Sequence, residues 1–419
     1  MTQRERLMPD NRPSVIKSHT SEPYAAGQTG AGQTLRHDFS LSAVLAGCVA
    51  VLIGYSSSAA IIFQAAAAAG ADQAQIGSWM WALGIGMGLT SLGLSWCHRT
   101  PLLTAWSTPG AALLITQLPG VPFEQALGAF VVCSLLLMIV GVSDLMTRLM
   151  NAVPASLAAA MLAGILLPFG LDIFLAMEAE PLLPLTLLAC WIAARRWLPS
   201  LAIPLVLIAG LALSLVSGQL DTSHIELALT TPQWTTPEFS LNVCLGVGVP
   251  LFLVTMATQN LPGVAIIRTA GFQPPVGSAL RWTGIASLLM APFGGHGINL
   301  AAISAAPCVG EESHPDLRRR YIAGMSAGVV YLVLGLLGST VTALFTALPD
   351  TLVMSFAGLA LMGTLGGGLR SAFQGDTDLD APLVTFLITA SSITLLGIGS
   401  AFWGLIAGLV VHLIRKSRP

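Results

Sequence analysis

Charge is the scarcest property of this chain. Of its 419 residues only 9% are charged and 54% are hydrophobic, with 18 Lys and Arg against 20 Asp and Glu. A soluble domain carries about 25% charged residues. The low charge and a mean hydropathy of +0.78 exclude a water-facing surface over most of the chain. No basic patch is present to indicate nucleic-acid binding.

Paired cysteines and known catalytic motifs are also missing. The six cysteines lie in or beside apolar segments and form no CxxC pair, so we expect neither a metal site nor a disulfide. The sequence contains no HExxH and no GxSxG motif. "GQTGAGQT" (27–34) lacks the lysine that a phosphate-binding loop requires. We therefore expect no enzyme and no cofactor.

Long apolar runs are abundant. Runs of about 20 residues, each able to cross a hydrocarbon core of about 30 Å, follow one another from residue 41 to 414. This pattern predicts an all-α polytopic membrane protein. Hydropathy predicts about fourteen transmembrane segments, at 41–69, 74–96, 101–119, 124–149, 153–171, 181–198, 201–217, 239–267, 277–290, 291–307, 318–347, 350–370, 381–396 and 398–414.

The positions of the charges predict the orientation of these segments. If the N-terminus is cytoplasmic, one group of arginines lies at cytoplasmic segment ends: Arg99, Arg148, Arg195, Arg196, Arg268, Arg281, Arg318, Arg319, Arg320, Arg370 and Arg415. The acids Glu178, Glu180, Asp221, Glu226 and Glu238 then lie outside. This arrangement satisfies the positive-inside rule and predicts that both termini are cytoplasmic. The polar residues 1–40 are predicted to be a disordered cytoplasmic tail.

Segments of the two halves resemble each other. "NAVPASLAAAMLAGILL" (151–167) matches "TALPDTLVMSFAGLALM" (346–362), and "AAIIFQAAAAAGADQAQIGSW" (59–79) resembles "GVAIIRTAGFQPPVGSAL" (263–280). Any two apolar segments look somewhat alike, but these matches occur in the same order. About seven segments per copy is an odd number, which predicts an inverted repeat. The expected divisions are a first repeat at 41–217, an extracytoplasmic loop at 218–238, a second repeat at 239–414 and a cytoplasmic end at 415–419.

One apolar segment in each half, the third and the tenth, is interrupted. In "LLTAWSTPGAALL" (102–114), an extended run is predicted to lead into a short helix that begins at Ser107, Thr108 and Pro109, because hydroxyl caps and an early proline favour a helix start. In "APFGGHGINLAAISAA" (291–306), the glycines are predicted to break an extended run over 287–293, with a helix resuming at Ile298.

An inverted repeat would aim the N-termini of both half-helices at the bilayer midplane. Each N-terminus carries roughly +0.5 charge and free N–H donors, so the pair approximates one positive charge without Lys or Arg. We place none of the twenty acidic residues at the midplane, although a site for cations or nucleobases would be expected to keep a buried carboxylate. The two breaks therefore predict an anion site.

The candidate substrate-binding residues come from these breaks and from the helices before them. They are Tyr55, Ser56, Ser57, Ser107, Thr108, Gly110, Gln259, Asn260, Gly295, His296, Gly297 and Asn299. The serines of "GYSSSAA" (54–60) serve equally well as helix–helix hydrogen-bond donors. Phe63, Trp106 and Phe293 suit an aromatic substrate body or simply pack. The clusters "GIGMG" (84–88), "GLLG" (335–338) and "GGG" (366–368) predict close helix packing.

His296 is the one histidine predicted to lie deep in the membrane. Ionisable groups at this depth are usually functional, and a histidine titrates near physiological pH. Proton coupling through His296 is one interpretation. The other is a neutral imidazole that donates one hydrogen bond to the backbone or to the substrate, since the substrate carboxylate could itself carry the proton.

Three strings give the chain a family resemblance: "STPGAALL" (107–114), "TQNLPGVAIIRTAGFQPPVGSAL" (258–280) and "APFGGHGINLAAISAA" (291–306). Together they resemble the benzoate–proton symporters, bacterial inner-membrane carriers, over roughly residues 40–415. The resemblance implies a seven-plus-seven inverted-repeat fold with core and gate domains, similar to that of the nucleobase and sulfate/bicarbonate transporters. It also implies import of benzoate or a similar aromatic carboxylate with protons.

The resemblance leaves other functions to be weighed. Nucleobase carriers hold their substrate with glutamates on the eighth and tenth segments, where this chain offers Gln259, Asn260, His296 and Asn299. This difference argues against uracil or xanthine. A carrier of another anion and an uncoupled anion channel stay open as alternatives, and an intramembrane enzyme is disfavoured. The expected partners are a benzoate-like anion, a proton and the lipid bilayer, and a homo-oligomer is compatible with these features.

Overall fold

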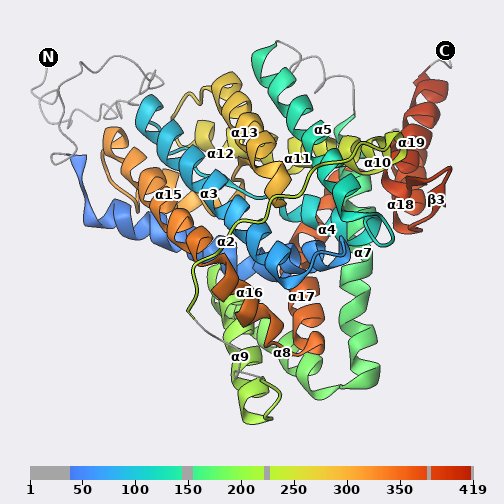
Figure 1. Cartoon of the computed structure of the whole chain (residues 1–419), viewed down its shortest axis with the longest axis horizontal. Coiled ribbons are helices and arrows are strands. Elements are labelled where there is room, and N and C mark those ends of the chain that lie inside the picture. The colour runs from blue at the N-terminus through green and yellow to red at the C-terminus, as the bar shows by residue number, and fades with distance from the viewer. Residues whose placement is uncertain (1–37, 144–153, 221–226, 375–378, 417–419) are drawn as a thin grey trace, which may run out of the picture.

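The computed structural model describes residues 38–143, 154–220, 227–374 and 379–416, and these are almost entirely helical (Figure 1). The predicted tail up to residue 37, together with Arg148, Asp221 and Glu226, lies outside the described residues. The first half contains α2 (Leu41–Ala68), α3 (Gln73–His98), α4 (Thr108–Gln117), α5 (Phe123–Val142), α7 (Ala155–Ala179), α8 (Leu182–Trp197) and α9 (Ala202–Val216).

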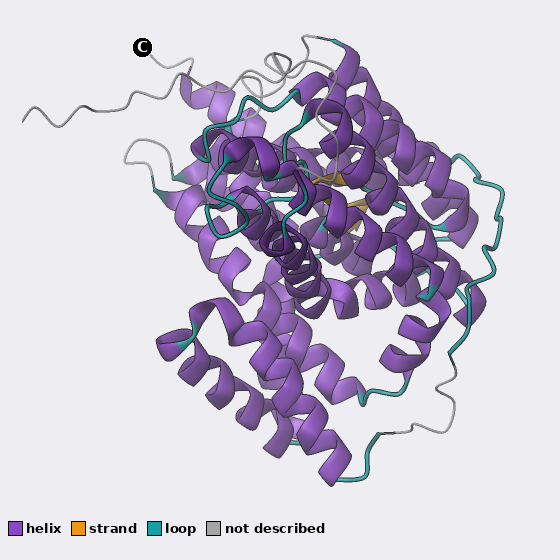
Figure 2. Ribbon diagram, turned by 90° about the vertical axis from the view of Figure 1, so that its left-hand side faces the viewer, coloured by secondary structure: helices purple, strands orange, loops and turns teal. Residues whose placement is uncertain are grey.

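The second half begins with a long interrupted helix and is also mostly helical. It contains α10 (Leu241–Val243), α11 (Val249–Thr255), α12 (Leu261–Thr269), α13 (Val276–Met290), α14 (Ala306–Val309), α15 (Tyr321–Leu336), α16 (Gly338–Thr346), α17 (Asp350–Phe373), α18 (Asp380–Ala390) and α19 (Ser400–Lys416). Figure 2 shows how little strand the chain contains. The strands are β1 (Thr104–Ala105) paired with β2 (Asn299–Leu300), and β3 (Thr394–Leu395) paired with β4 (Ile398–Gly399).

Six of the described helices are long and apolar enough to cross a membrane: Leu41–Ala68, Gln73–His98, Phe123–Val142, Ala155–Glu178, Leu241–Thr269 and Asp350–Phe373. The fifth joins α10, α11 and α12 through two π-helical turns, Cys244–Gly248 and Met256–Asn260. A further pair, Leu317–Leu336 and Gly338–Thr346, is bent by 67° at its break. The predicted segment at 318–347 is therefore two helices rather than one.

Large apolar side chains cover the outside of the molecule. Val216, Leu52 and Leu413 are 85%, 64% and 62% exposed, and many similar residues lie on other helices. A soluble monomer rarely exposes so much contiguous apolar surface. Lipid is the solvent that suits this exterior, as the low charge content predicted.

Glycines allow the backbones of two central helices to come into direct contact. A Cβ added to Gly84 on α3 would lie 2.4 Å from the Cα of Gly335 on α15. The close packing predicted for the clusters at 84–88 and 335–338 is therefore present, as small residues allow in membrane helices. The prediction for 366–368 is wrong at Gly366 and Gly367, where an added Cβ would meet nothing within 4 Å.

The helices form two groups by their contacts: α7 packs on α17 and α18, and α18 packs on α19, whereas α3 packs on α15 and α5 on α13. In Figure 1, α8 and α9 lie at the lower end of the molecule with the lower parts of α7 and α17, and α2, α3 and α15 lie side by side above them. We call the group of α2–α5 and α10–α16 the core, and the group of α7–α9 and α17–α19 the gate. The cavities described below lie where these groups meet.

Candidate functional site

The first interruption begins a helix as the sequence predicts. Residues 101–107 are extended and include β1, and α4 follows. Ser107 is the N-cap, and its side chain accepts a hydrogen bond from the backbone N–H of Gly110 at 3.0 Å. Pro109 occupies the first turn, where its missing N–H removes no intrahelical bond. These local signals fix the start of α4.

The second interruption differs from the prediction. Residues 287–290 are the last turn of α13, not an extended run, and Ala291–Phe293 form a 3₁₀ turn. Gly294 then reverses the chain with φ +95°. Helical backbone resumes at Ile303, not at Ile298.

Long-range hydrogen bonds explain why the second helix starts late. β2 pairs antiparallel with β1, with Thr104 opposite Leu300 and Ala105 opposite Asn299. The backbone N–H of Ala301 also donates to the carbonyl of Leu103 at 2.9 Å. Non-helical backbone inside a membrane protein needs such partners. The backbone groups of the two interruptions therefore hydrogen-bond to each other, and the residues between Ile298 and Ala301 stay extended.

A cavity of about 480 Å³ lies beside this crossing point. Its core wall includes Trp106, Thr108 and Pro109 at the start of α4, together with Ala302 and Ser304 at the start of the second half-helix. Its gate wall comes from α8, α9 and α17. Ligand pockets are typically about 300–1,000 Å³. The N-terminal ends of both half-helices thus line one space of ligand size.

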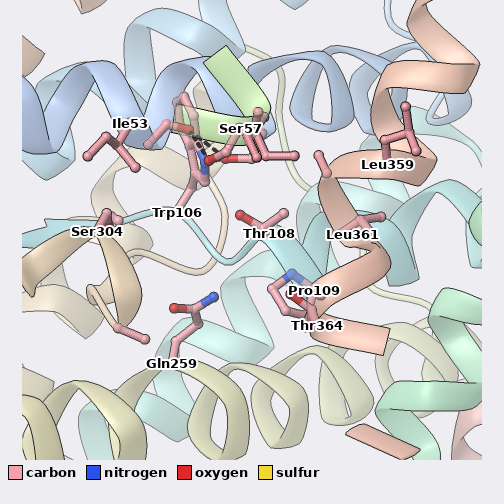
Figure 3. A pocket seen from close by; sticks show the side chains of 18 of the residues that line it. Ile53, Ser57, Trp106, Thr108, Pro109, Gln259, Ser304, Leu359, Leu361 and Thr364 are labelled. Atoms are coloured by element: carbon pink, nitrogen blue, oxygen red, sulfur yellow. Dashed lines mark hydrogen bonds between the residues drawn. The ribbon is translucent and has the colours of Figure 1, made fainter. Parts of the chain in front are cut away.

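Hydroxyl side chains supply most of the polar groups of this cavity. In Figure 3 the amide of Gln259 points into it from one side, towards the start of α4 at Thr108 and Pro109, and Thr364 lies nearby on α17. The hydroxyl of Ser57 donates to the carbonyl of Gly54 at 3.0 Å, within its own helix. No acidic residue occurs among the described residues that line the cavity, and Arg195 is their single charged member.

A second cavity of about 550 Å³ adjoins the first between α7, the α11–α12 region and α17. The two cavities share Thr258, Pro262, Gly363 and Thr364 in their walls. A continuous crevice therefore separates this part of the core from the gate.

Three of the predicted residues, Ser57, Thr108 and Gln259, line the first cavity. Other predicted residues lie just behind its wall. The ring of Tyr55 packs on Trp106 with centroids 4.7 Å apart, and its buried hydroxyl has no partner among the described residues. Ser56 donates to the carbonyl of Ile53 at 3.3 Å, within its own helix and not to another helix as the alternative interpretation predicts. Ser107 and Gly110 form the cap of α4.

Asn260 ties α12 to β2 instead of facing the cavity. Its side chain is fully buried, and Oδ1 accepts a hydrogen bond from the backbone N–H of Leu300 at 3.0 Å. Asn299 donates from Nδ2 to the carbonyl of Gly297, while its buried Oδ1 has no described partner. Gly297 has φ +54°, and Gly295 belongs to the same extended run.

His296 lies in an aromatic enclosure and not among the residues that line the cavity. Its ring is fully buried, with centroids 5.2 Å from Trp79 and 5.3 Å from Phe130. The indole N–H of Trp79 donates to Nδ1 of His296 at 3.0 Å, and Nε2 has no partner among the described residues. Because an indole nitrogen can only donate, Nδ1 must accept, and the neutral ring carries its proton on Nε2.

The sequence did not identify several lining residues. Ser58 accepts a hydrogen bond from the indole N–H of Trp106 at 2.8 Å, and Ser304, Thr364, Trp191 and Arg195 also line the cavity. The gate residues have no local signal, because only the packing of α8 and α17 against the core brings them to the site. Of the aromatic candidates Trp106 lines the cavity, whereas Phe63 packs on Phe345 and Phe293 on Trp81.

We expect Asn260 to have a structural role and the adjacent Gln259 to have a binding role. Replacing Asn260 by Ala leaves the buried N–H of Leu300 unpaired, which should cost roughly 1–3 kcal/mol of stability. Gln259→Ala is the matched control. Because the Gln259 side chain faces the cavity, its loss should alter ligand affinity with little loss of stability. Thermal unfolding of the two purified variants checks this assignment. Equal melting temperatures for both would contradict the role given to Asn260.

Known proteins resemble this chain over nearly its whole length. A family model described as benzoate membrane transport protein matches residues 37–414. The chain is 47% identical over 371 residues to the inner membrane protein YdcO of Escherichia coli, covering 88% of this chain and 95% of that protein. It is 38% identical over 382 residues to the benzoate membrane transport protein of Acinetobacter baylyi, covering 91% and 97% of the two chains.

Solved structures share the fold at low sequence identity. The transmembrane domain of the cyanobacterial bicarbonate transporter BicA matches with a TM-score of 0.59 and 17% identity, covering 88% of this chain and 96% of that one. The murine anion transporter Slc26a9, solved in its inward-facing state, matches with a TM-score of 0.55 and 14% identity, covering 91% and 69%. The predicted similarity to sulfate/bicarbonate-type transporters is therefore present at the level of fold.

Proposed function

Because the chain belongs to the benzoate membrane transport protein family, we propose that it imports benzoate or a similar aromatic carboxylate together with protons. The chain is a membrane transporter and not an enzyme. The observation that carries the proposed substrate class is the cavity wall that contains the N-terminal residues of both half-helices. A carboxylate placed there would lie at the positive ends of both half-helices.

The electrostatic balance of the cavity favours an anion. A charge at the bilayer centre costs about 2.5–3.5 kcal/mol on insertion scales. A partly buried helix terminus returns up to ~2 kcal/mol, so two termini can offset most of this cost for one carboxylate. The absence of acids from the described lining residues supports this preference and argues against a nucleobase, which would need a buried carboxylate partner.

Matched helix contacts support a seven-plus-seven inverted repeat with boundaries at 41–217 and 239–414. α3 packs on α15 as α13 packs on α5, and α8 packs on α9 as α18 packs on α19. α7 and α17 both begin directly after a proline with similar backbone angles, Pro154 at φ −55° and Pro349 at φ −60°. Such a repeat gives alternating access when the core moves against the gate.

The cavity mouth supports an inward-facing conformation. Arg195 and Pro199 are exposed and line the cavity, so its open end lies near the end of α8. By the positive-inside rule this end is cytoplasmic. His296 would then lie towards the opposite face, because it precedes the second half-helix on the chain that descends from α13. We assign the coupling proton to this buried ring.

Uptake into proteoliposomes tests the proposal. With an inward-directed proton gradient, purified protein should accumulate labelled benzoate, and salicylate should compete better than uracil or sulfate. Protein-free liposomes are the control for passive entry of the neutral acid. Failure to take up benzoate would remove the proposed substrate, and accumulation that ignores the gradient would remove proton coupling. Currents far above carrier turnover would favour an anion channel instead.

A further inference from the structure

The gate wall of the cavity carries one charged residue. Arg195 lies one helical turn after Trp191 on α8, and both side chains line the cavity. Residues four apart share one face of a helix. The guanidinium carbon of Arg195 is 5.2 Å from the centroid of the Trp191 ring, within the range of a cation–π contact.

Arg195 has no acidic partner among the described residues. Its Nη1 atom would lie 3.6 Å from a Cβ added to Gly363 on α17, so the guanidinium extends from α8 to the backbone of the neighbouring gate helix. Gly363 lines both cavities. An unneutralised cation thus stands at the point where the crevice between core and gate opens.

The core and gate walls offer complementary groups to one kind of molecule. The core wall presents the N-terminus of α4 and the hydroxyl of Ser304, and the gate wall presents an indole ring beside a planar guanidinium. A guanidinium binds a carboxylate through two parallel hydrogen bonds, and an indole face accepts an aromatic ring. An aromatic carboxylate carries both features in one plane.

We propose that Trp191 and Arg195 form a second anion subsite on the gate wall, which receives the carboxylate as it leaves the half-helix ends for the cytoplasm. This assignment rests on the proposed function and adds the residues that give the site its cytoplasmic side. Arg195 pairs with the carboxylate directly, and Trp191 contacts the substrate ring. The subsite draws anions towards the cavity mouth through its uncompensated charge.

Neighbouring arginines provide a matched comparison. Arg195→Gln and Arg196→Gln each remove one positive charge from the last turn of α8, so both lose the same favourable interaction with the helix dipole. Arg196 does not belong to the residues that line the cavity. Arg195→Lys keeps the charge and removes the bidentate geometry.

The dissociation constant of benzoate, measured by calorimetry on lipid-reconstituted protein at low and high salt, separates these variants. Loss of a charge-assisted hydrogen bond predicts a roughly tenfold weaker affinity for Arg195→Gln at low salt. Arg195→Lys should fall between it and the wild type, and Arg196→Gln should stay within about twofold, because the Arg196 side chain does not line the cavity. The difference between the two glutamine variants should shrink in 0.5 M salt, since screening lengths shorten.

The outcomes distinguish this subsite from the proposed function. If the wild type binds benzoate and Arg195→Gln matches Arg196→Gln, the subsite is wrong and the proposed function stands. If the wild type binds sulfate or bicarbonate instead, the same comparison is made with that anion, and a tenfold effect supports an anion subsite at Arg195 without an aromatic substrate. If it binds none of these anions, both assignments fall.

Discussion

Thr108→Asp is expected to abolish benzoate uptake without unfolding the protein. Thr108 is the first residue of α4 and lines the cavity beside the helix N-terminus. An added carboxylate there favours the helix, because acidic groups are stabilising at N-termini. The same carboxylate opposes an anionic substrate by about 4 kcal/mol if the charges approach to roughly 4 Å at an effective dielectric constant of about 20. This penalty corresponds to an affinity loss of roughly a thousandfold.

Thr108→Asn is the matched control, since asparagine and aspartate have nearly the same shape. It should retain most of the uptake, and both variants should melt near the wild-type temperature. Uptake and binding of labelled benzoate check the pair. Equal activity of the aspartate and asparagine variants would show that substrate charge does not approach α4.

His296→Phe is expected to remove gradient-driven accumulation and to leave benzoate–benzoate exchange in place. Phenylalanine can keep the ring contacts with Trp79 and Phe130, but it removes both nitrogens. In the neutral state Nδ1 accepts from the Trp79 indole, so adding a proton at Nδ1 must break that hydrogen bond. Proton binding at Nδ1 therefore competes with the Trp79 hydrogen bond, while the imidazole itself carries the coupling proton.

Trp79→Phe provides the comparison for the histidine variant. It removes the indole donor and leaves His296 able to bind a proton, so coupling should persist. Each single variant leaves one buried partner of this hydrogen bond unpaired, the Trp79 indole N–H in His296→Phe and the His296 Nδ1 in Trp79→Phe. Each should lose about 1–3 kcal/mol of stability. Accumulation ratios measured with and without a pH gradient test both. Normal accumulation by His296→Phe would place the proton elsewhere, and loss of coupling in both variants would indicate packing of the pair rather than titration.

The parts of the site that depend on local chemistry could be predicted from sequence. The cap at Ser107 and the proline at 109 act within one helical turn, so the start of α4 is where the residues indicate. The second break could not be placed correctly in this way. Its extended residues are held by β1 and by Asn260, which lies far away along the chain. Local sequence signals carry no information about such distant partners. The sequence therefore predicts the start of the second half-helix too early.

The same limit applies to which polar residues face the cavity. Gln259 and Asn260 are adjacent and similar, yet one faces the cavity and the other pins β2, because they point to different sides of one helix. His296 stands out in the sequence as a buried ionisable group, but its direction depends on Trp79 and Phe130 from two other helices. In the sequence, Arg195 is one of several arginines at predicted cytoplasmic segment ends and does not stand out as a site residue. Only the packing of the gate against the core brings it to the site.

A structure determined with 4-iodobenzoate, at a concentration that inhibits benzoate uptake, tests the central claim most directly. The heavy iodine atom would mark the position of the ring. We predict a carboxylate at the N-terminal ends of the two half-helices, beside Thr108 and Ser304, with the ring in the cavity between core and gate. A ligand bound elsewhere, with this cavity empty, would contradict the assignment of the anion site to the half-helix ends.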